Sequence, residues 1–195
     1  MTVLNWITNL TVRYSIICAK GTGNLETAYA RASSAMRKPD SKMKDVKELL
    51  LNIWPNDDEF KSSFKEKTLS SPRIIKYLFA RMEVAITQDD SLIPNPETLS
   101  VEHILPKKPG AKWPPKMRSV EFLKEHLSKI GNFTILTEPM NRDCESREFQ
   151  FKKTIYKDSR YKLTNTLCQI SDWSETVIEQ RQAELAELAA STWVI

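Results

Sequence analysis

Apolar residues recur at helical spacing through the first ninety residues, and this periodicity constrains the fold of the chain more than any other feature. Each of three stripes, spaced three or four residues apart, predicts one buried helix face. The stripes are Val3, Ile7, Leu10, Tyr14 and Ile17; Met43, Val46, Leu50 and Ile53; and Ile74, Leu78, Met82 and Ala85. Turn-forming residues separate them at 21–23, 38–40, 55–57 and 70–72. The pattern predicts about five helices in an orthogonal bundle.

The segment 89–100 interrupts this pattern, because it is rich in Pro, Asn and Ser. Pro94 and Pro96 disfavour helix there. We therefore expect two domains, a helical N-terminal subdomain at 1–90 and a second domain at 91–195.

Short β-prone runs distinguish the second domain. We expect a strand at 99–105 stopped by Pro106, a basic loop at 107–116, a helix at 119–128 and a second strand at 133–137. The last segment predicts an amphipathic helix, whose stripe contains Trp173, Val177, Ile178, Arg181, Leu185 and Leu188.

Composition places the chain among folded proteins, since 41% of its 195 residues are hydrophobic and 28% are charged. No apolar run reaches the length of a membrane span, so we expect a cytoplasmic protein without a membrane partner. Cys18, Cys144 and Cys168 are odd in number and far apart. They predict neither a disulfide framework nor a structural zinc site.

Charge is unevenly distributed along the chain, although the net charge is only +4. Residues 101–165 contain fourteen Lys and Arg against eight Asp and Glu, whereas the tail from Thr166 contains one Arg against five acids. The basic middle of the chain could lie along a phosphate backbone. A solvated basic face is the alternative interpretation.

The two histidines have different settings. We expect His126 on the polar side of its helix and assign it no role. His103 ends the first strand, where an imidazole that titrates near neutrality can take a proton from water. Asn132 opens the second strand and Asn141, nine residues later, begins a helical stretch. A strand-strand-helix hairpin can bring together a base, an amide that orients it and an amide oxygen for Mg²⁺ or Mn²⁺.

In combination, these residues resemble the His-Asn-Asn version of the HNH motif, also called the ββα-metal or His-Me finger motif. More narrowly, the chain is similar to the C-terminal nuclease domain of GmrSD-type restriction enzymes. The matching residues are Glu102–Pro106, Gly131–Leu136, Asn141, Phe149 and Lys152, with the lead-in at Arg13-Tyr14 and the closing helix at Trp173–Arg181.

The resemblance implies a mainly α fold that contains a small ββα-metal hairpin, with the helical N-terminal bundle packed on the nuclease core. It implies a metal-dependent endonuclease that hydrolyses DNA in restriction and phage defence. His103 would be the general base, and Asn132 would hold its imidazole or shape the hairpin. Asn141 would bind one divalent ion, Mg²⁺ or Mn²⁺.

Other residues have two interpretations. Glu102 could be a second metal ligand or a structural residue, because adjacent strand residues point to opposite faces. A group of cations could hold phosphates or could form an ordinary charged face: Lys152, Lys153, Arg142 and Arg147. Trp113, in the basic loop, is the aromatic residue that we would test for DNA contact, although a core position is the simpler interpretation.

One position departs from the family pattern, because Ser146 stands where these proteins commonly have another Asn. If that position binds the metal, the assignment of Asn141 is wrong. The resemblance also implies a nucleotide-binding sensor domain. The chain has no Gly-rich phosphate loop, so we expect that domain on an N-terminal part or a separate subunit. Two alternatives to a DNA endonuclease are a catalytically silent nucleic-acid-binding or assembly module and an RNA endonuclease.

Overall fold

The computed structural model describes residues 2–89 and 94–195, and it divides the chain into two compact units. Unit 1 comprises Met1–Lys65 and Ala189–Ile195, and unit 2 comprises Glu66–Leu188. The division that we predicted at residue 90 falls on residues outside the described ones. Among the residues that the structure describes, no helix combines the length and the apolar character of a membrane span.

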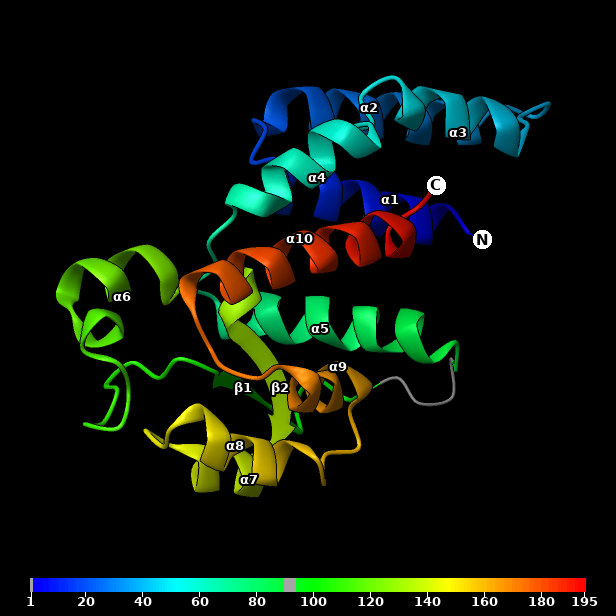
Figure 1. The fold of residues 1–195 in the computed structure, drawn as a ribbon. Coiled ribbons are helices and arrows are strands. Elements are labelled where there is room, and N and C mark those ends of the chain that lie inside the picture. Colours follow the sequence, from blue (N-terminus) through cyan, green and yellow to red (C-terminus); the bar gives the residue numbers. More distant parts are fainter. Residues whose placement is uncertain (1, 90–93) are drawn as a thin grey trace. The chain divides into compact units, whose positions relative to one another are not determined.

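Unit 1 is helical. It contains α1 (Val3–Thr11), α2 (Thr22–Met36), α3 (Met43–Leu51) and most of α4 (Asp57–Glu66), with a π-helical segment at Val12–Ile17 (Figure 1). The Thr2 side chain caps α1, and α3 packs against both α1 and α2. The first two apolar stripes of the sequence meet in one core, formed by Trp6, Leu10, Tyr14, Leu25, Ala32, Val46 and Leu50.

Arg13 is a buried cation in unit 1, with only 1% of its surface exposed. Its guanidinium donates to the carbonyls of Trp193, Ala190 and Pro55 and forms an ion pair with Asp57. These bonds join the last residues of the chain to the first helices, because two of the acceptors belong to the C-terminal segment.

Unit 2 surrounds a two-stranded antiparallel sheet of β1 (Leu99–His103) and β2 (Phe133–Thr137) (Figure 1). α5 (Pro72–Thr87) and α7 (Glu138–Cys144) contact both strands, and α9 (Lys162–Asn165) contacts β2. The other α-helices of the unit are α6 (Val120–His126), α8 (Phe149–Tyr156) and the greater part of α10 (Glu175–Thr192). Short 3-10 turns lie at Pro115–Arg118, Ile130–Asn132 and Thr166–Gln169.

The register of the hairpin places His103 opposite Phe133 and Glu102 opposite Thr134. The first strand ends at His103, two residues earlier than we predicted from 99–105. Beyond His103, the N–H of Ile104 donates to the backbone carbonyl of Asn132. The N–H of Leu105 donates to the side-chain oxygen of Asn132. These bonds replace the regular ladder. The second strand has the predicted bounds.

Local sequence signals account for several helix ends. Pro72 occupies the first turn of α5, and the hydroxyls of Ser119 and Ser174 accept N–H bonds at the starts of α6 and α10. The core of unit 2 contains Ile104, Leu105, Trp113, Met117, Phe122, Leu136, Cys144, Phe149, Tyr156, Leu167, Trp173 and Ile178. The prediction of a mainly helical fold with a small antiparallel hairpin is thus confirmed.

Candidate active site

A cavity of about 880 Å³ lies in unit 2 beside the hairpin. Its wall combines the end of β1, the start of α5, the basic loop after Pro106 and the end of α7. Polar and charged side chains gather on that wall: Lys76, Ser100, His103, Lys107, Lys108, Asn141, Arg142 and Glu145. Of the residues that the sequence suggested, the wall contains four: Glu102, His103, Asn141 and Arg142.

His103 ends β1 at this cavity. Its ring meets the Phe133 ring edge to face, with centroids 4.9 Å apart. Burial first, and then the positive charges of Lys107 and Lys152, lower the pKa of His103 to about 4. The imidazole is consequently neutral at pH 7, so one ring nitrogen has a lone pair that can accept a proton. A phosphate anion in the cavity would raise this pKa toward neutrality, because an opposite charge favours the protonated form.

Asn132 is fully buried, and its side chain forms hydrogen bonds with the turn that follows His103. Its Oδ1 accepts the N–H of Leu105 at 2.8 Å, and its Nδ2 donates to the carbonyls of Leu105 and Leu127, each at 3.1 Å. Of the two roles that the sequence left open for Asn132, shaping the hairpin is the one that these bonds support.

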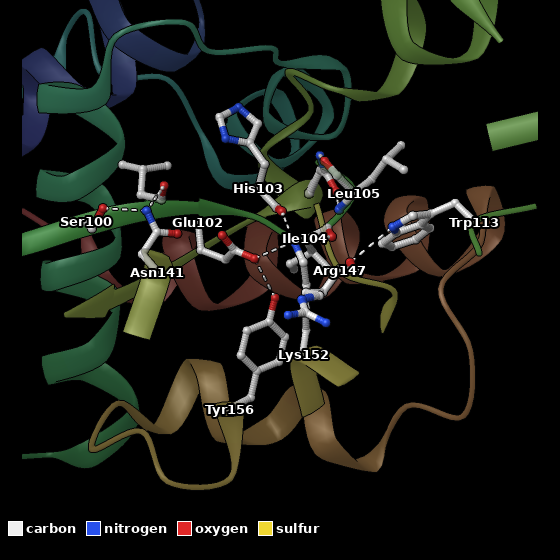
Figure 2. A network of polar contacts seen from close by, with 12 residues as sticks. Ser100, Glu102, His103, Ile104, Leu105, Trp113, Asn141, Arg147, Lys152 and Tyr156 are labelled. Carbon is white, nitrogen blue, oxygen red and sulfur yellow. Dashed lines mark hydrogen bonds and ion pairs between the residues drawn. The ribbon is translucent and has the colours of Figure 1, made fainter. Parts of the chain in front are cut away.

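Asn141 reaches the cavity because α7 begins at Glu138, directly after β2 ends at Thr137. Its Nδ2 donates to the Ser100 hydroxyl at 2.6 Å and to the Val101 carbonyl at 3.4 Å (Figure 2). These bonds orient the amide, so that Oδ1 is the atom left for an outside donor or a cation.

Glu102 points away from His103, toward the interior on the other side of β1 (Figure 2). Its Oε1 pairs with Lys152 Nζ at 2.6 Å and accepts the Tyr156 hydroxyl at 3.0 Å. Lys152 Nζ also donates to the carbonyls of His103 at 2.9 Å and Ile104 at 3.1 Å. Burial raises the pKa of Glu102, whereas Lys152 and the tyrosine hydroxyl oppose that rise.

This network bears on the two interpretations of Glu102. Although Glu102 belongs to the cavity wall, its side chain is 5% exposed and Lys152 is 0% exposed. All three protons of the Lys152 ammonium have acceptors inside the protein. The placement therefore favours the structural role for Glu102, and it leaves Lys152 no proton with which to bind a DNA phosphate.

The remaining residues considered for DNA contact are dispersed. Arg142 is exposed and lies on the cavity wall. The Arg147 guanidinium stacks over the Phe151 ring at 4.6 Å, and Lys153 Nζ donates to the Ile170 carbonyl at 2.8 Å. Neither of these two residues belongs to the cavity wall.

Trp113 is 3% exposed and packs in the core of unit 2, where its Nε1 donates to the Arg147 carbonyl at 3.1 Å. This placement matches the simpler interpretation of a core aromatic residue. Its ring is not available for stacking on a base in this conformation.

Sequence reasoning missed several members of the cavity wall. Lys76 comes from α5, and no local pattern links that helix to the hairpin. Lys107 and Lys108 lie in the loop that we predicted to be basic, but the sequence analysis assigned neither lysine a role. Glu145 follows α7 with φ at 35°, a backbone conformation that residues other than glycine rarely adopt. No sequence signal announces this conformation.

The placement of His126 corrects our prediction of a polar helix face. The residue is 1% exposed, and its ring stacks on Phe122 with centroids 4.1 Å apart. α6 packs this side of its surface against the core, so the charged neighbours of His126 in the sequence were a misleading signal.

The donor atoms at the cavity fit a hard divalent cation. Asn141 offers an amide oxygen and Glu145 a carboxylate on the same cavity wall as His103. Oxygen donors of this kind suit Mg²⁺ or Mn²⁺. The carboxylate of Glu102 is less suited, because it is buried and its Oε1 is shared by Lys152 and Tyr156.

Comparison with known proteins bears on the same part of the chain. No curated protein matches the sequence. The family described as GmrSD restriction endonucleases, C-terminal domain, matches residues 54–188, which include all of unit 2. This match covers more than half of the chain and confirms the resemblance seen in the sequence. We conclude that the chain belongs to the family of the C-terminal domains of GmrSD restriction endonucleases.

Proposed function

We propose that unit 2 is a metal-dependent endonuclease of the HNH type that hydrolyses phosphodiester bonds in DNA. The observation that supports this most directly is that His103, Asn141 and several cations share one cavity in a chain of the GmrSD family. His103 takes the proton of the attacking water. A divalent ion held by Asn141 and Glu145 would neutralise charge on the phosphate and on the departing oxygen.

The cations of the cavity wall position the DNA backbone. Lys107, Lys108 and Arg142 are exposed, and phosphate contacts from such side chains set the register of a duplex without reading its sequence. We do not assign this role to Lys152, which is buried. The substrate would be phage or modified DNA, selected by a nucleotide-binding sensor domain on the same or another chain, in line with a restriction system.

Plasmid cleavage tests the proposal. Supercoiled DNA is incubated with the purified chain in EDTA, Mg²⁺ or Mn²⁺, beside His103→Ala and the exposed control Glu121→Gln. We expect metal-dependent nicking that is retained in Glu121→Gln and lost in His103→Ala. Equal cleavage by His103→Ala, with its fold verified by circular dichroism, would exclude His103 as the base.

The same reagents separate the two alternative functions. His103→Ala should still bind DNA if the protein is a nuclease. Binding without cleavage in the unmodified chain under every metal condition would instead support a silent binding module. Duplex DNA, single strands and RNA are compared at one salt concentration, because the electrostatic part of binding depends steeply on salt. Preferential cleavage of RNA would replace the proposed substrate.

A further inference from the structure

A second group of metal-binding side chains lies outside the cavity wall, between α6 and α10. It consists of His126 from α6 and Glu175 and Glu179 from α10. One ligand atom of each residue lies within 4.8 Å of the other two. Glu175 and Glu179 are four residues apart on one helix, so their carboxylates lie on the same helix face.

The imidazole of His126 supplies an independent reason to expect a ligand. His126 is 1% exposed, and its Nε2 is buried without a hydrogen-bond partner among the described residues. A buried polar atom without a partner is costly, so it calls for an explanation. The nearest carboxylate oxygen, Glu175 Oε1, is 3.8 Å away, which is too far for a hydrogen bond.

The other ring nitrogen of His126 is already engaged. Nδ1 lies 3.0 Å from the carbonyl of Phe122, and a carbonyl only accepts, so Nδ1 carries the proton. In the tautomer with a single proton, on Nδ1, Nε2 has a lone pair for a ligand. A histidine ligand whose second nitrogen donates to a backbone carbonyl is the usual arrangement at protein metal sites.

We propose that His126, Glu175 and Glu179 form a second metal site, which binds a divalent transition-metal ion of the Zn²⁺ class and joins α6 to α10. The imidazole disfavours Mg²⁺ and Ca²⁺, which prefer oxygen ligands. Ligand atoms around a tetrahedral zinc lie about 3.4 Å apart, given bond lengths of about 2.0–2.2 Å. Shifts of about 1 Å in the two partly exposed glutamates would close the site.

Two lysines compete with the ion for these carboxylates. Lys116 pairs with Oε2 of Glu175, and Lys129 pairs with Oε1 of Glu179 at 3.1 Å. Each pairing uses one oxygen and leaves the other for the metal. The lysines therefore provide a matched control, since replacing them removes the same ion pairs while it keeps the ligands.

The site would stabilise the segment that leads to the hairpin. Leu127 and Ser128 follow α6 directly and line the cavity beside His103, and Gly131 is held from α10 by the side chain of Gln182. An ion bound by both α6 and α10 would link the two helices that hold residues 127–131 in place. The inference does not depend on the nuclease activity, because it concerns binding of the metal alone.

Nuclear magnetic resonance of the imidazoles tests the site directly, because the chain contains only two histidines. In His103→Ala the remaining ring signal belongs to His126. Added Zn²⁺ should shift that signal with a stoichiometry of one ion per chain. An unchanged signal at saturating Zn²⁺ overturns the proposal.

Titration calorimetry with Zn²⁺ then identifies the carboxylate ligands. Glu179→Gln and Glu175→Gln/Glu179→Gln should each weaken Zn²⁺ binding by about tenfold or more. Lys116→Met/Lys129→Met should retain or strengthen it. Equal Zn²⁺ affinity in the glutamate variants overturns the proposal, as does an equal loss in the lysine variant, which would attribute the effect to the ion pairs. Glu179→Gln keeps the test valid if the double variant fails to fold.

Discussion

At the scale of single residues, the two asparagines of the site have separable tasks. Asn132 is buried with three hydrogen bonds to the chain, whereas Asn141 makes two bonds and faces the cavity. The first amide holds the turn after His103 in place. The second uses its Nδ2 for both bonds and leaves Oδ1 for another partner.

Asn132→Ala should therefore act on stability. The change leaves one N–H and two carbonyls without partners, and we expect the free energy of unfolding to fall by about 3 kcal/mol. Asn141→Ala is the contrast, for which we expect a small change in unfolding and loss of metal-dependent cleavage. Urea denaturation and plasmid cleavage of both variants measure the two effects. If Asn132→Ala has normal stability, the hairpin role is excluded.

The buried pair of Glu102 and Lys152 gives a second prediction for single residues. Lys152→Met leaves the carboxylate of Glu102 buried without its cation, which should cost about 3–5 kcal/mol in unfolding free energy. Adding Glu102→Gln removes the unpaired charge, so the double variant should recover part of the loss. The measurement is a double-mutant cycle by urea denaturation. Additive losses would show that the two residues do not act as a pair.

Sequence reasoning located His103 and Asn141 because their types and spacing are local features. It could not settle Glu102, since the partners of Glu102 are Lys152 and Tyr156, about fifty residues further along the chain. Tertiary packing decides whether such an acid meets a cation or a solvent-filled cavity. The prediction of an exposed His126 was wrong for the same reason, because burial of its helix face depends on α10.

At the scale of elements, α10 supports the hairpin through a close approach at Gly131. A Cβ on Gly131 would lie 2.2 Å from the carbonyl oxygen of Ile178. Arg181 of α10 donates to the carbonyls of Gly131 and Phe133, and its burial lowers the pKa of the guanidinium to about 10. The close packing leaves no room for a side chain at residue 131.

Gly131→Ala should accordingly destabilise unit 2 by about 3 kcal/mol, at the upper end of overpacking effects. Gly110→Ala is the matched control, because its Cβ would meet only the Ser146 carbonyl, at an ordinary 3.5 Å. We expect that change to stay within about 0.5 kcal/mol. Thermal unfolding of both variants provides the comparison, and equal stability would show that α10 adapts without cost.

The basic loop after β1 is the element for which we predict an effect on DNA binding. Lys107→Gln/Lys108→Gln should weaken DNA affinity and lower its salt dependence by about one counterion for each phosphate that is no longer neutralised. Lys112→Gln is the control, since Lys112 lies in the same loop but pairs with Glu148 outside the cavity wall. Fluorescence anisotropy at several salt concentrations measures both quantities. An equal effect of the two variants would assign DNA binding to the whole loop rather than to the cavity.

Most helices and strands could be predicted from the sequence, because the spacing of apolar residues and the positions of Pro and Ser are local features. The second strand and the closing helix are examples. The first strand was predicted to continue to Leu105, but bonds from Ile104 and Leu105 to Asn132 end the ladder at His103. Hydrophobic patterning could not reveal this end, since both residues are buried whether they are in a strand or in a turn.

At the scale of the whole molecule, the residues matched by the family, 54–188, contain the whole of unit 2. The matched residues end at 188, where unit 2 also ends, and Ala189–Ile195 belong to unit 1. α10 therefore contributes to both units. No sequence pattern predicted that the last residues would complete the core of the first helices.

Deletion of residues 189–195 should loosen unit 1 selectively. It removes the buried Trp193 and two of the carbonyls that accept from Arg13. We expect faster amide hydrogen exchange in α1 and α3, with protection kept in β1 and β2. Arg13→Met should raise exchange in the same helices, as an independent check. Unchanged exchange in unit 1 would mean that the C-terminal segment is not needed for its fold.

The opposite orientations of Glu102 and His103 have a consequence for how the length of β1 can vary in this chain. Because side chains alternate along a strand, gain or loss of one residue within β1 would turn the imidazole inward and bring the acid to the cavity. The cavity would lose the imidazole, and the interior would lose the ion pair of Glu102 with Lys152. Insertions and deletions within the five residues of β1 should therefore abolish function.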